Sequence, residues 1–273
     1  MTCRPFAISA ALLLAALPVL AAAQPTTEPT TQPTSRPTTQ PTTMPAEMDE
    51  AEPVDEMVEQ EVLQEDVATK TLTDRIMKAH GIDAWNRVDR IKFTFIPANA
   101  TAELAEVHHD WDRVAGEDTV RLGDLGEPVT VNVGAFDSES ATEDEKRAFQ
   151  RWTNDGFWLL AVFKLRDAGG TRSVLERTEI NGVEYDALQV TYEGVGLTPG
   201  DSYVYYADEA GVVRYWDYRP AGTERSVRWS WEDYQNVGGV MLALDHKPQG
   251  QSGQAPRILI DNVEVEVRSS PEE

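Results

Sequence analysis

The sequence has one cysteine among its 273 residues, and this residue, Cys3, lies before the apolar run near the N-terminus. A cysteine that receives a lipid anchor would follow such a run, so Cys3 is not placed for lipid attachment. The rest of the chain has no cysteine. This excludes disulfide bonds, a thiol nucleophile and a cysteine-ligated zinc site from that part of the protein.

Long apolar runs are also lacking, with one exception that approaches the length of a membrane span. This run, Phe6–Ala23, follows the positively charged Arg4 and ends in small residues, which is typical of a signal peptide. We expect cleavage after Ala23, export to the periplasm, the cell surface or the medium, and no integral membrane span afterwards. A retained anchor is the alternative, but the run is rich in alanine and contains Pro18.

Basic residues are scarce. The chain has 24 lysines and arginines against 47 aspartates and glutamates, for a formal net charge of −23. Such a charge repels nucleic-acid phosphates and anionic lipid headgroups. Arg225 and Arg228 stand beside Glu224 and Glu232, so basic residues do not gather into a local binding patch there. We therefore expect no nucleic acid among the partners.

Composition divides the chain into four segments. After the predicted signal peptide of residues 1–23, proline recurs every fourth residue from Pro25 to Pro45, and an acidic stretch continues to Asp66. Such a segment has little apolar surface to bury, so residues 24–68 are predicted to form a disordered Pro/Thr-rich and then acidic tether. Residues 69–268 are predicted to form one folded domain, and residues 269–273 a disordered tail.

Strand signals dominate the predicted domain. Apolar and polar residues alternate in "IKFTFI" from Ile91, and similar stretches recur between short turns up to Val267. Asn181-Gly182 is a strong signal for a two-residue hairpin turn, and Gly116-Glu117-Asp118 is predicted to turn between two earlier strands. Successive strands joined by tight turns indicate an antiparallel meander.

Two helical stretches interrupt these strands. The first, "TKTLTDRIMKAHG", ends at Gly81, and the second opens with Thr142-x-x-Glu145, a capping box. The apolar segment "FWLLAVFKL" follows the second and must be covered, so we expect a helical pair in the middle of the chain. The predicted fold class is mainly β (α+β), a curved antiparallel sheet or open half-barrel with an N-terminal helix and a mid-chain helical lid or plug.

The order of these motifs resembles a known superfamily. The helix end Ala79-His80-Gly81, the insert "WLLAVFKLRDAG", the strand pair "YDALQVTYEGVGLTPGDSYVYYADEAGVVRYWDY" and the late strand "WSWEDYQNVGGVMLALDHKP" occur in this order. Together they are similar to secreted bacterial proteins of the outer-membrane lipoprotein carrier-like (lipoprotein localisation factor) superfamily, over roughly Thr69 to Val267. The resemblance implies a bent half-barrel with a helical lid, and a hollow that in the carriers binds acyl chains. It transfers no ligand contact to a particular residue.

Aromatic residues supply the most informative candidate site. Several lie on the helical insert, and others share one face of a late strand. They are expected either to pack a plain core or to line an apolar hollow between insert and sheet. The candidate ligand-binding residues are Phe149, Trp152, Phe157, Trp158, Leu160, Phe163, Trp229 and Trp231.

Residues for catalysis or metal binding form no recognised pattern. The chain has four histidines, no G-x-S-x-G motif and no H-E-x-x-H motif. On a strand His108, Asp110 and Asp112 would share one face, while His109 and Trp111 would take the other. Nothing in the sequence places a further ligand beside them. We therefore predict no catalytic residue, no metal site, no cofactor and no enzymatic activity.

Two functions remain. The first is an exported, non-enzymatic binding or carrier module whose hydrophobic hollow accepts a lipid, an acylated molecule or another apolar ligand. The alternative is an envelope or surface interaction protein with a fully packed core, whose partner is a polysaccharide, a protein or another envelope component. A hollow lined by the aromatic residues would favour the first function, whereas aromatic rings exposed on strands would favour sugar stacking.

Overall fold

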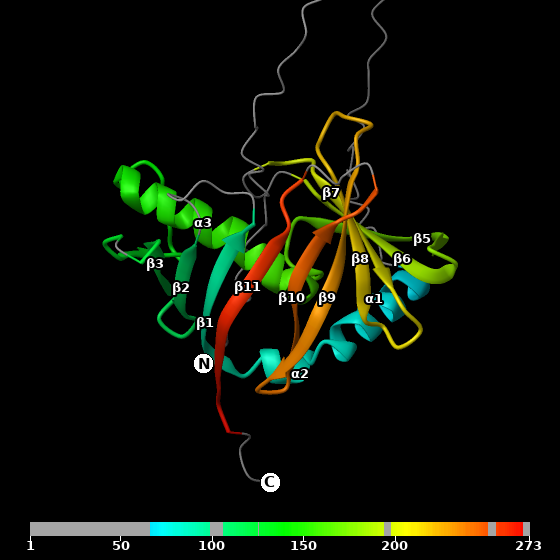
Figure 1. Ribbon diagram of the computed structural model, residues 1–273, viewed down its shortest axis with the longest axis horizontal. Helices are drawn as coiled ribbons and strands as arrows, with labels where there is room; N and C mark the ends of the chain where they lie inside the picture. Colours follow the sequence, from blue (N-terminus) through cyan, green and yellow to red (C-terminus); the bar gives the residue numbers. More distant parts are fainter. Residues whose placement is uncertain (1–65, 99–105, 125, 194–197, 251–254, 270–273) are drawn as a thin grey trace, which may run out of the picture. The chain divides into compact units, whose positions relative to one another are not determined.

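A computed structural model of the protein describes residues 66–98, 106–124, 126–193, 198–250 and 255–269 (Figure 1). The predicted signal peptide, nearly all of the predicted tether and residues 270–273 lie outside these ranges, so the four-segment division stays a prediction. No helix in the described ranges is both long enough and apolar enough to span a lipid bilayer.

The described strands form one antiparallel sheet of eleven strands in the order β4-β3-β2-β1-β11-β10-β9-β8-β7-β6-β5. The chain makes two meanders, β1 to β4 and β5 to β11, which join where β1 pairs with β11. Since β4 and β5 stand at opposite ends of this order, the curved sheet is open, and the predicted fold class is confirmed. The strands are β1 (Val88–Pro97), β2 (Val107–Asp112), β3 (Glu117–Leu122), β4 (Val129–Asn132), β5 (Gly170–Ile180), β6 (Val183–Tyr192), β7 (Ser202–Ala207), β8 (Val213–Arg219), β9 (Val227–Val237), β10 (Val240–Pro248) and β11 (Ile258–Val267).

The hairpin at Asn181-Gly182 has the predicted geometry. Ile180 and Val183 pair directly across it. Both turn residues have positive φ angles, 54° for Asn181 and 80° for Gly182. This is the backbone that a type I′ turn needs and that asparagine and glycine adopt most easily.

The turn between β2 and β3 lies earlier than predicted. Glu117 and Asp118 belong to β3, so placing them in the turn was wrong. The reason is local: the Asp112 side chain accepts hydrogen bonds from the backbone N–H groups of Val114 at 2.9 Å and Ala115 at 2.8 Å. These bonds close the turn before Glu117 is reached.

Helices occupy two parts of the described chain: α1 (Val67–Ala79) and α2 (Ile82–Trp85) precede the sheet, and α3 (Glu143–Leu160) and the 3-10 turn η2 (Ala161–Lys164) follow β4. The capping box is confirmed, because Thr142 and Glu145 bond to one another's backbone N–H groups. The helix then continues through Gly156 without a break. The capping-box segment and the start of the apolar segment are therefore one helix rather than a helical pair.

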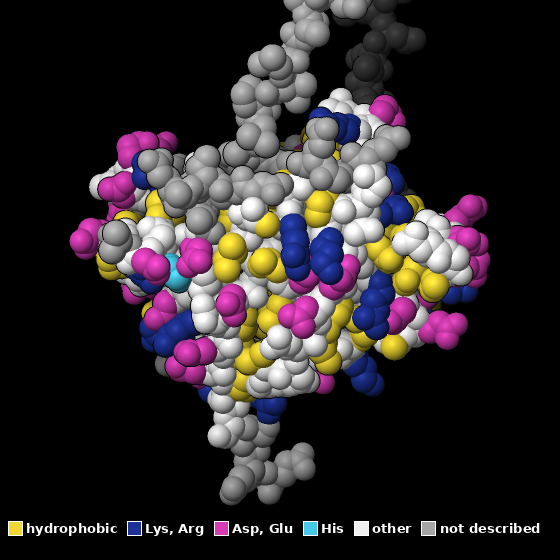
Figure 2. Space-filling model, in the orientation of Figure 1, with side chains coloured by type: hydrophobic (Ala, Val, Ile, Leu, Met, Phe, Trp, Pro, Cys, Tyr) yellow, Lys and Arg dark blue, Asp and Glu magenta, His cyan; other side chains and the backbone are white. Residues whose placement is uncertain are grey.

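The two faces of the sheet are buried differently. The helix α3 lies behind the sheet in Figure 1, and most of the buried apolar side chains form one large core that includes its residues. A smaller cluster lies apart from this core, consisting of Ile180, Tyr185, Ala187, Val204 and Tyr206. Figure 2 shows the face that is turned away from α3, where charged side chains of both signs stand among scattered apolar ones.

Candidate ligand-binding site

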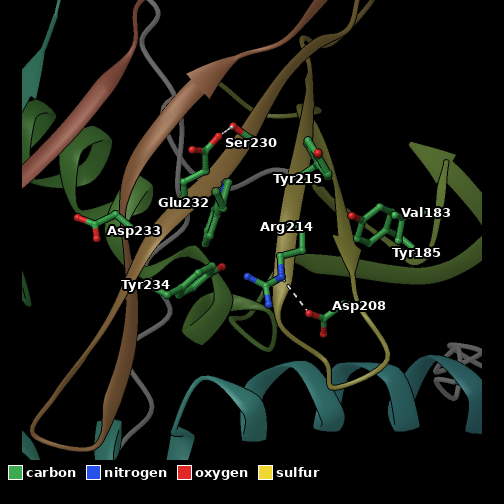
Figure 3. Close-up of a pocket in the computed structure, with 10 residues that line it drawn as sticks. Val183, Tyr185, Asp208, Arg214, Tyr215, Ser230, Glu232, Asp233 and Tyr234 are labelled. Carbon is green, nitrogen blue, oxygen red and sulfur yellow. Dashed lines mark hydrogen bonds and ion pairs between the residues drawn. The ribbon is translucent and has the colours of Figure 1, made fainter. Parts of the chain in front are cut away.

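A pocket opens where β8 and β9 stop pairing (Figure 3). The last paired residues are Tyr215 and Ser230, beyond which β9 continues alongside β10. Asp233, whose backbone is left-handed with φ of 49°, lies in the part of β9 that no longer pairs with β8. The pocket has a volume of about 590 Å³ and is lined by Val183, Tyr185, Asp208, Arg214, Tyr215, Ser230, Trp231, Glu232, Asp233 and Tyr234.

The rim of this pocket is polar and aromatic. Arg214 and Tyr234 face each other across the gap between the strands (Figure 3), with 5.6 Å between the guanidinium carbon and the ring centre. Arg214 Nε donates to Asp208 Oδ2 at 2.9 Å, and Ser230 Oγ donates to Glu232 Oε1 at 2.7 Å. The Tyr234 hydroxyl donates to a carbonyl of β8. The rim therefore offers donors, acceptors and ring faces to a polar group.

Trp231 connects the pocket to the core. It lines the pocket, yet it is only 2% exposed. Its ring centre lies 5.0 Å from that of His246 and 5.5 Å from that of Trp216, and both of these residues are fully buried. The inner wall of the pocket is thus part of the large core.

Behind this wall, aromatic side chains cross four neighbouring strands on the face covered by α3. Tyr205 of β7 pairs with Trp216 of β8, and Trp216 pairs with Trp229 of β9. Two positions along β9, Trp231 pairs with His246 of β10. Because side chains two residues apart on a strand share a face, these five rings form one continuous surface, here called the aromatic stripe.

The part of α3 that covers the aromatic stripe is apolar. Phe157 lies 5.5 Å from Trp216 between ring centres, and Trp158 lies 5.1 Å from Trp229 and 5.4 Å from His246. Neither phenylalanine nor the hydrocarbon part of tryptophan can accept a hydrogen bond in the ordinary sense. The covering side chains therefore leave the polar atoms of the stripe to find partners elsewhere.

Three of those polar atoms have no partner in the described structure. Among the described residues, the Tyr205 hydroxyl and the indole nitrogens of Trp216 and Trp231 are buried without a hydrogen bond. Trp229 differs, because its indole nitrogen donates to the Pro256 carbonyl at 3.1 Å. Each buried polar group without a partner costs roughly 1–3 kcal/mol. Such a concentration of them is common at sites that bind water or a ligand.

His246 is held in its neutral form. Burial lowers its pKa to about 3, against smaller opposing effects from the charge of Asp245 and a hydrogen bond to the Ala243 backbone. A neutral imidazole carries one donor nitrogen and one acceptor nitrogen. The stripe therefore presents hydrogen-bonding groups without a net charge from its histidine.

The structure divides the sequence-predicted site residues between two places. Phe157, Trp158, Trp229 and Trp231 meet at the aromatic stripe, whereas Phe163 stacks on Trp85 with 4.8 Å between ring centres. Trp152 and Phe149 lie on the same side as Trp85, near Trp111 and Phe136 respectively. Seven of the eight are buried and Phe149 is half-buried, the buried ones being Trp152, Phe157, Trp158, Leu160, Phe163, Trp229 and Trp231. That a ligand binds among them stays a prediction.

Sequence reasoning missed the pocket itself. Its three tyrosines, Tyr185, Tyr215 and Tyr234, come from three strands, and only the register of the sheet brings them together. Arg214 lies on β8 just after the turn closed by a hydrogen bond from Gly211 N–H to the Asp208 carbonyl, but nothing in that stretch shows that β9 diverges there. The positive φ of Asp233 has no sequence signal as strong as a glycine would give.

A second polar group is buried under the same helix, around Asp155, which precedes Phe157 by two residues. His109 Nδ1 lies 2.7 Å from Asp118 Oδ2, and His109 Nε2 lies 3.1 Å from Asp155 Oδ2. Arg151 also binds Asp155, with Nη2 at 2.7 Å from Oδ2, and the ring of Phe93 stacks on that of His109. This group joins β2 and β3 to α3 by charged hydrogen bonds.

His109 is correspondingly held in its protonated form. Burial alone would lower its pKa, but the charge of Asp118 and hydrogen bonds to Asp118 and Asp155 raise it to about 9. The sequence places Asp118 and Asp155 far apart, so this cluster also escaped prediction. With both ring nitrogens engaged by carboxylates, His109 is suited to holding α3 against the sheet.

His108, which the sequence groups with Asp110 and Asp112 on one strand face, lies nearer to other carboxylates. Asp110 is engaged by Arg90 through two hydrogen bonds, of 2.5 and 2.8 Å. His108 instead comes close to Glu106 and Asp124, and one ligand atom from each of the three lies within 4.8 Å of the others. These three residues could hold a metal ion, although exposed acidic groups often gather without one.

Comparisons with known proteins give matches at the level of structure. No family model matches the chain, and no curated protein matches it. A DUF1329 family protein from Desulfovibrio piger has a TM-score of 0.42 and 10% identity, covering 74% of this chain and 95% of that one. A LolA superfamily protein from Nitrosomonas europaea has a TM-score of 0.39 and 8% identity, covering 74% of this chain and 94% of that one.

At these identities and TM-scores the likeness carries no argument about family or role, and the chemistry of the site has to be derived from its own residues.

Proposed function

We propose that the protein is an exported, non-enzymatic binding or carrier module for a lipid, an acylated molecule or another apolar ligand. The observation that carries this proposal is the aromatic stripe, which lies beneath an apolar helix and borders an open pocket through Trp231. An apolar wall with a few polar groups and a mouth to solvent is the usual make-up of a small-molecule site.

The two parts of the site suit the two parts of an amphiphile. The apolar part of the ligand would lie between the aromatic stripe and the Phe157–Trp158 segment of α3, and it would displace side chains that now pack together. The polar part would remain at the rim, where Arg214 and Tyr234 face each other. Burial of the apolar part would supply most of the affinity, since roughly 25 cal/mol is gained per Å² of apolar surface removed from water.

Uptake of an uncharged apolar fluorophore, such as N-phenyl-1-naphthylamine, tests this proposal. The mature chain from Gln24 should increase the fluorescence of the probe, and a native lipid extract should compete with it. Val183 is half exposed on the pocket wall, so Val183→Trp should narrow the mouth and slow uptake several-fold. Val174→Trp is the matched control, because Val174 is exposed on the neighbouring strand β5 and does not line the pocket. Absence of probe binding by well-folded protein would overturn the proposal.

A second function is favoured by the rim alone. Tyr185 and Tyr215 stand edge to face with 5.5 Å between ring centres, and Asp208, Glu232 and Asp233 add carboxylate acceptors around them. Aromatic faces beside carboxylates can bind sugars, which would make the protein an envelope interaction module. Retention on a cell-wall polysaccharide that is lost in Tyr215→Ala, without any uptake of the apolar probe by the wild type, would favour this alternative.

A further inference from the structure

We propose that the aromatic stripe recognises an acyl carbonyl, the C=O of an ester or amide that joins a hydrocarbon chain to its head group. This inference rests on the proposed function and goes further, since it names the chemical group that the buried part of the site selects. It stands on three side chains that are at least nine-tenths buried and whose polar atoms lack partners among the described residues: Tyr205, Trp216 and Trp231.

These three side chains are mutual neighbours, and His246 lies beside Trp231. The ring centre of Tyr205 lies 6.1 Å from that of Trp216 and 6.5 Å from that of Trp231. Trp231 in turn lies 5.5 Å from Trp216 and 5.0 Å from His246. Their unpartnered atoms therefore belong to one small region of the core, directly behind the pocket, rather than being scattered through the protein.

The donors in this region outnumber the acceptors. An indole N–H can only donate, so Trp216 and Trp231 each require an acceptor from an occupant. The Tyr205 hydroxyl and the neutral imidazole of His246 can adjust to donate or to accept. A carbonyl oxygen has two lone pairs and no hydrogen, which matches the two fixed donors.

The charge of the region excludes a carboxylate or phosphate at the same place. His246 is neutral, and the covering residues Phe157 and Trp158 carry no charge. An anion buried without a cationic partner is strongly disfavoured. A free fatty acid or a phosphate headgroup would therefore bind with its charged end at the rim, beside Arg214, and only an uncharged oxygen would reach the stripe.

The test compares ligands of similar length that carry an ester, an amide or no acyl linkage. Methyl dodecanoate, N-methyldodecanamide and the hydrocarbon tridecane would each displace N-phenyl-1-naphthylamine from the mature chain. Tyr205→Phe removes one oxygen that makes no hydrogen bond in the described structure, so the fold should be retained. It should weaken the ester and the amide by roughly three- to tenfold and leave tridecane unchanged, as expected for one lost hydrogen bond.

Two tryptophans provide a matched pair of variants. Trp216→Phe removes an unpartnered N–H and should lower the ratio of carbonyl to hydrocarbon affinity. Trp229→Phe removes an N–H that already donates to the Pro256 carbonyl. It should lower the affinity for carbonyl ligands and the affinity for the hydrocarbon by a similar factor. A larger loss for the ester than for the amide, or the reverse, would identify which acyl linkage the site prefers.

The outcomes separate the two proposals. If all three ligands bind and the affinity ratio is the same in every variant, carbonyl recognition is overturned while the carrier function stands, and the polar atoms serve internal water instead. If none of the ligands displaces the probe because the probe itself does not bind, the carrier function fails. Near-ultraviolet circular dichroism of each variant verifies that the aromatic core remains packed.

Discussion

Two buried histidines under the same helix behave in opposite ways. His109 on β2 has both ring nitrogens engaged by carboxylates, one of them from α3 itself. His246 on β10 interacts with the backbone of Ala243 on its own strand and faces Trp158 further along α3. The first is protonated and ties helix to sheet, whereas the second is neutral and makes no hydrogen bond to the described residues of α3. Burial alone thus says little about a side chain's role until its partners are counted.

The contrast extends to the regions around them. Near His109, the charges of Asp118, Asp155 and Arg151 make the contact between α3 and the sheet specific. Near His246, the contact consists of rings without hydrogen bonds across it. Moving α3 away from the sheet would therefore cost more free energy at His109 than at the aromatic stripe. A ligand could then enter beneath α3 at the stripe while the helix stays attached at His109.

The largest expected effect separates the two histidines by the same substitution. His109→Leu leaves the buried Asp118 without its cationic partner and should lower the free energy of unfolding by roughly 3–5 kcal/mol. His246→Leu removes a neutral ring whose hydrogen bond is to the backbone of Ala243 on its own strand, and should change it by only about 1 kcal/mol. Urea denaturation followed by tryptophan fluorescence measures both. Equal losses would show that the distinction between the two sites is wrong.

The pH dependence of stability should show the same contrast. A histidine in the unfolded chain titrates near 6.5, and the pKa of folded His109 is raised to about 9. Protonated His109 adds roughly 3 kcal/mol to the free energy of unfolding; this gain is fully present below pH 6.5 and is lost as the pH rises through 9. The pKa of His246 is lowered to about 3, so burial of its neutral ring costs no stability above pH 6.5, and the free energy of unfolding declines as the pH falls from 6.5 towards 3.

Denaturation of the wild type and both variants between pH 4 and pH 10 checks this pair of profiles. His109→Leu should flatten the alkaline decline alone, and His246→Leu should flatten part of the acidic decline. Burial lowers the pKa of His80 to about 4, so the loss of stability at acidic pH that is due to His80 should persist in both variants. A wild-type alkaline decline that survives unchanged in His109→Leu would contradict the charged role of His109.

A smaller effect is expected at Gly156, which lies between Asp155 of the polar cluster and Phe157 of the aromatic cover. No heavy atom of the described residues lies within 4 Å of a Cβ placed on it, so alanine fits. Gly156→Ala should stabilise α3 by roughly 0.5–1 kcal/mol, because glycine is a poor helix former. If α3 bends there to admit ligand, the same variant should also slow probe uptake in stopped-flow fluorescence. Faster uptake by the stabilised variant would oppose that bending.

The smallest effect concerns the ion pair at the pocket rim. Arg214 and Asp208 are partly exposed, so Arg214→Ala should cost only about 0–1 kcal/mol of stability. It should weaken binding of an anionic amphiphile more than that of an uncharged one, because the cation at the rim is lost. A double-mutant cycle with Asp208→Ala measures the coupling energy between Arg214 and Asp208. A coupling energy as large as that expected within the His109 cluster would contradict the description of Arg214 and Asp208 as an exposed ion pair at the rim.

Local sequence signals gave much of the fold. The alternating strands, the Asn181-Gly182 hairpin and the capping box at Thr142 each depend on a few neighbouring residues, and each is confirmed. The apolar face of α3 was also foreseen through Phe157 and Trp158. One local prediction was wrong: the turn was expected at Gly116-Glu117-Asp118, but hydrogen bonds to the Asp112 side chain close it earlier.

The candidate site depended on contacts that no local pattern contains. His109 finds its partners nine and 46 residues away, and the sequence gives no sign that these carboxylates meet. The pocket arises from the point at which β8 and β9 separate, which is set by sheet register. Unused hydrogen-bonding atoms, such as those of Tyr205 and Trp216, become visible only once every neighbour is in place.

The pairing of β1 with β11 has a consequence for how the protein is made. Val88 pairs with Val267, so the seam between the two meanders joins residues near the beginning and the end of the described domain. A chain synthesised N-terminus first can form each meander early, but not the seam. Contacts so distant in sequence slow folding, so the chain is expected to pass through a stage in which β1 and β11 are each unpaired at one edge. A chaperone that protects exposed strand edges would be most useful during this interval.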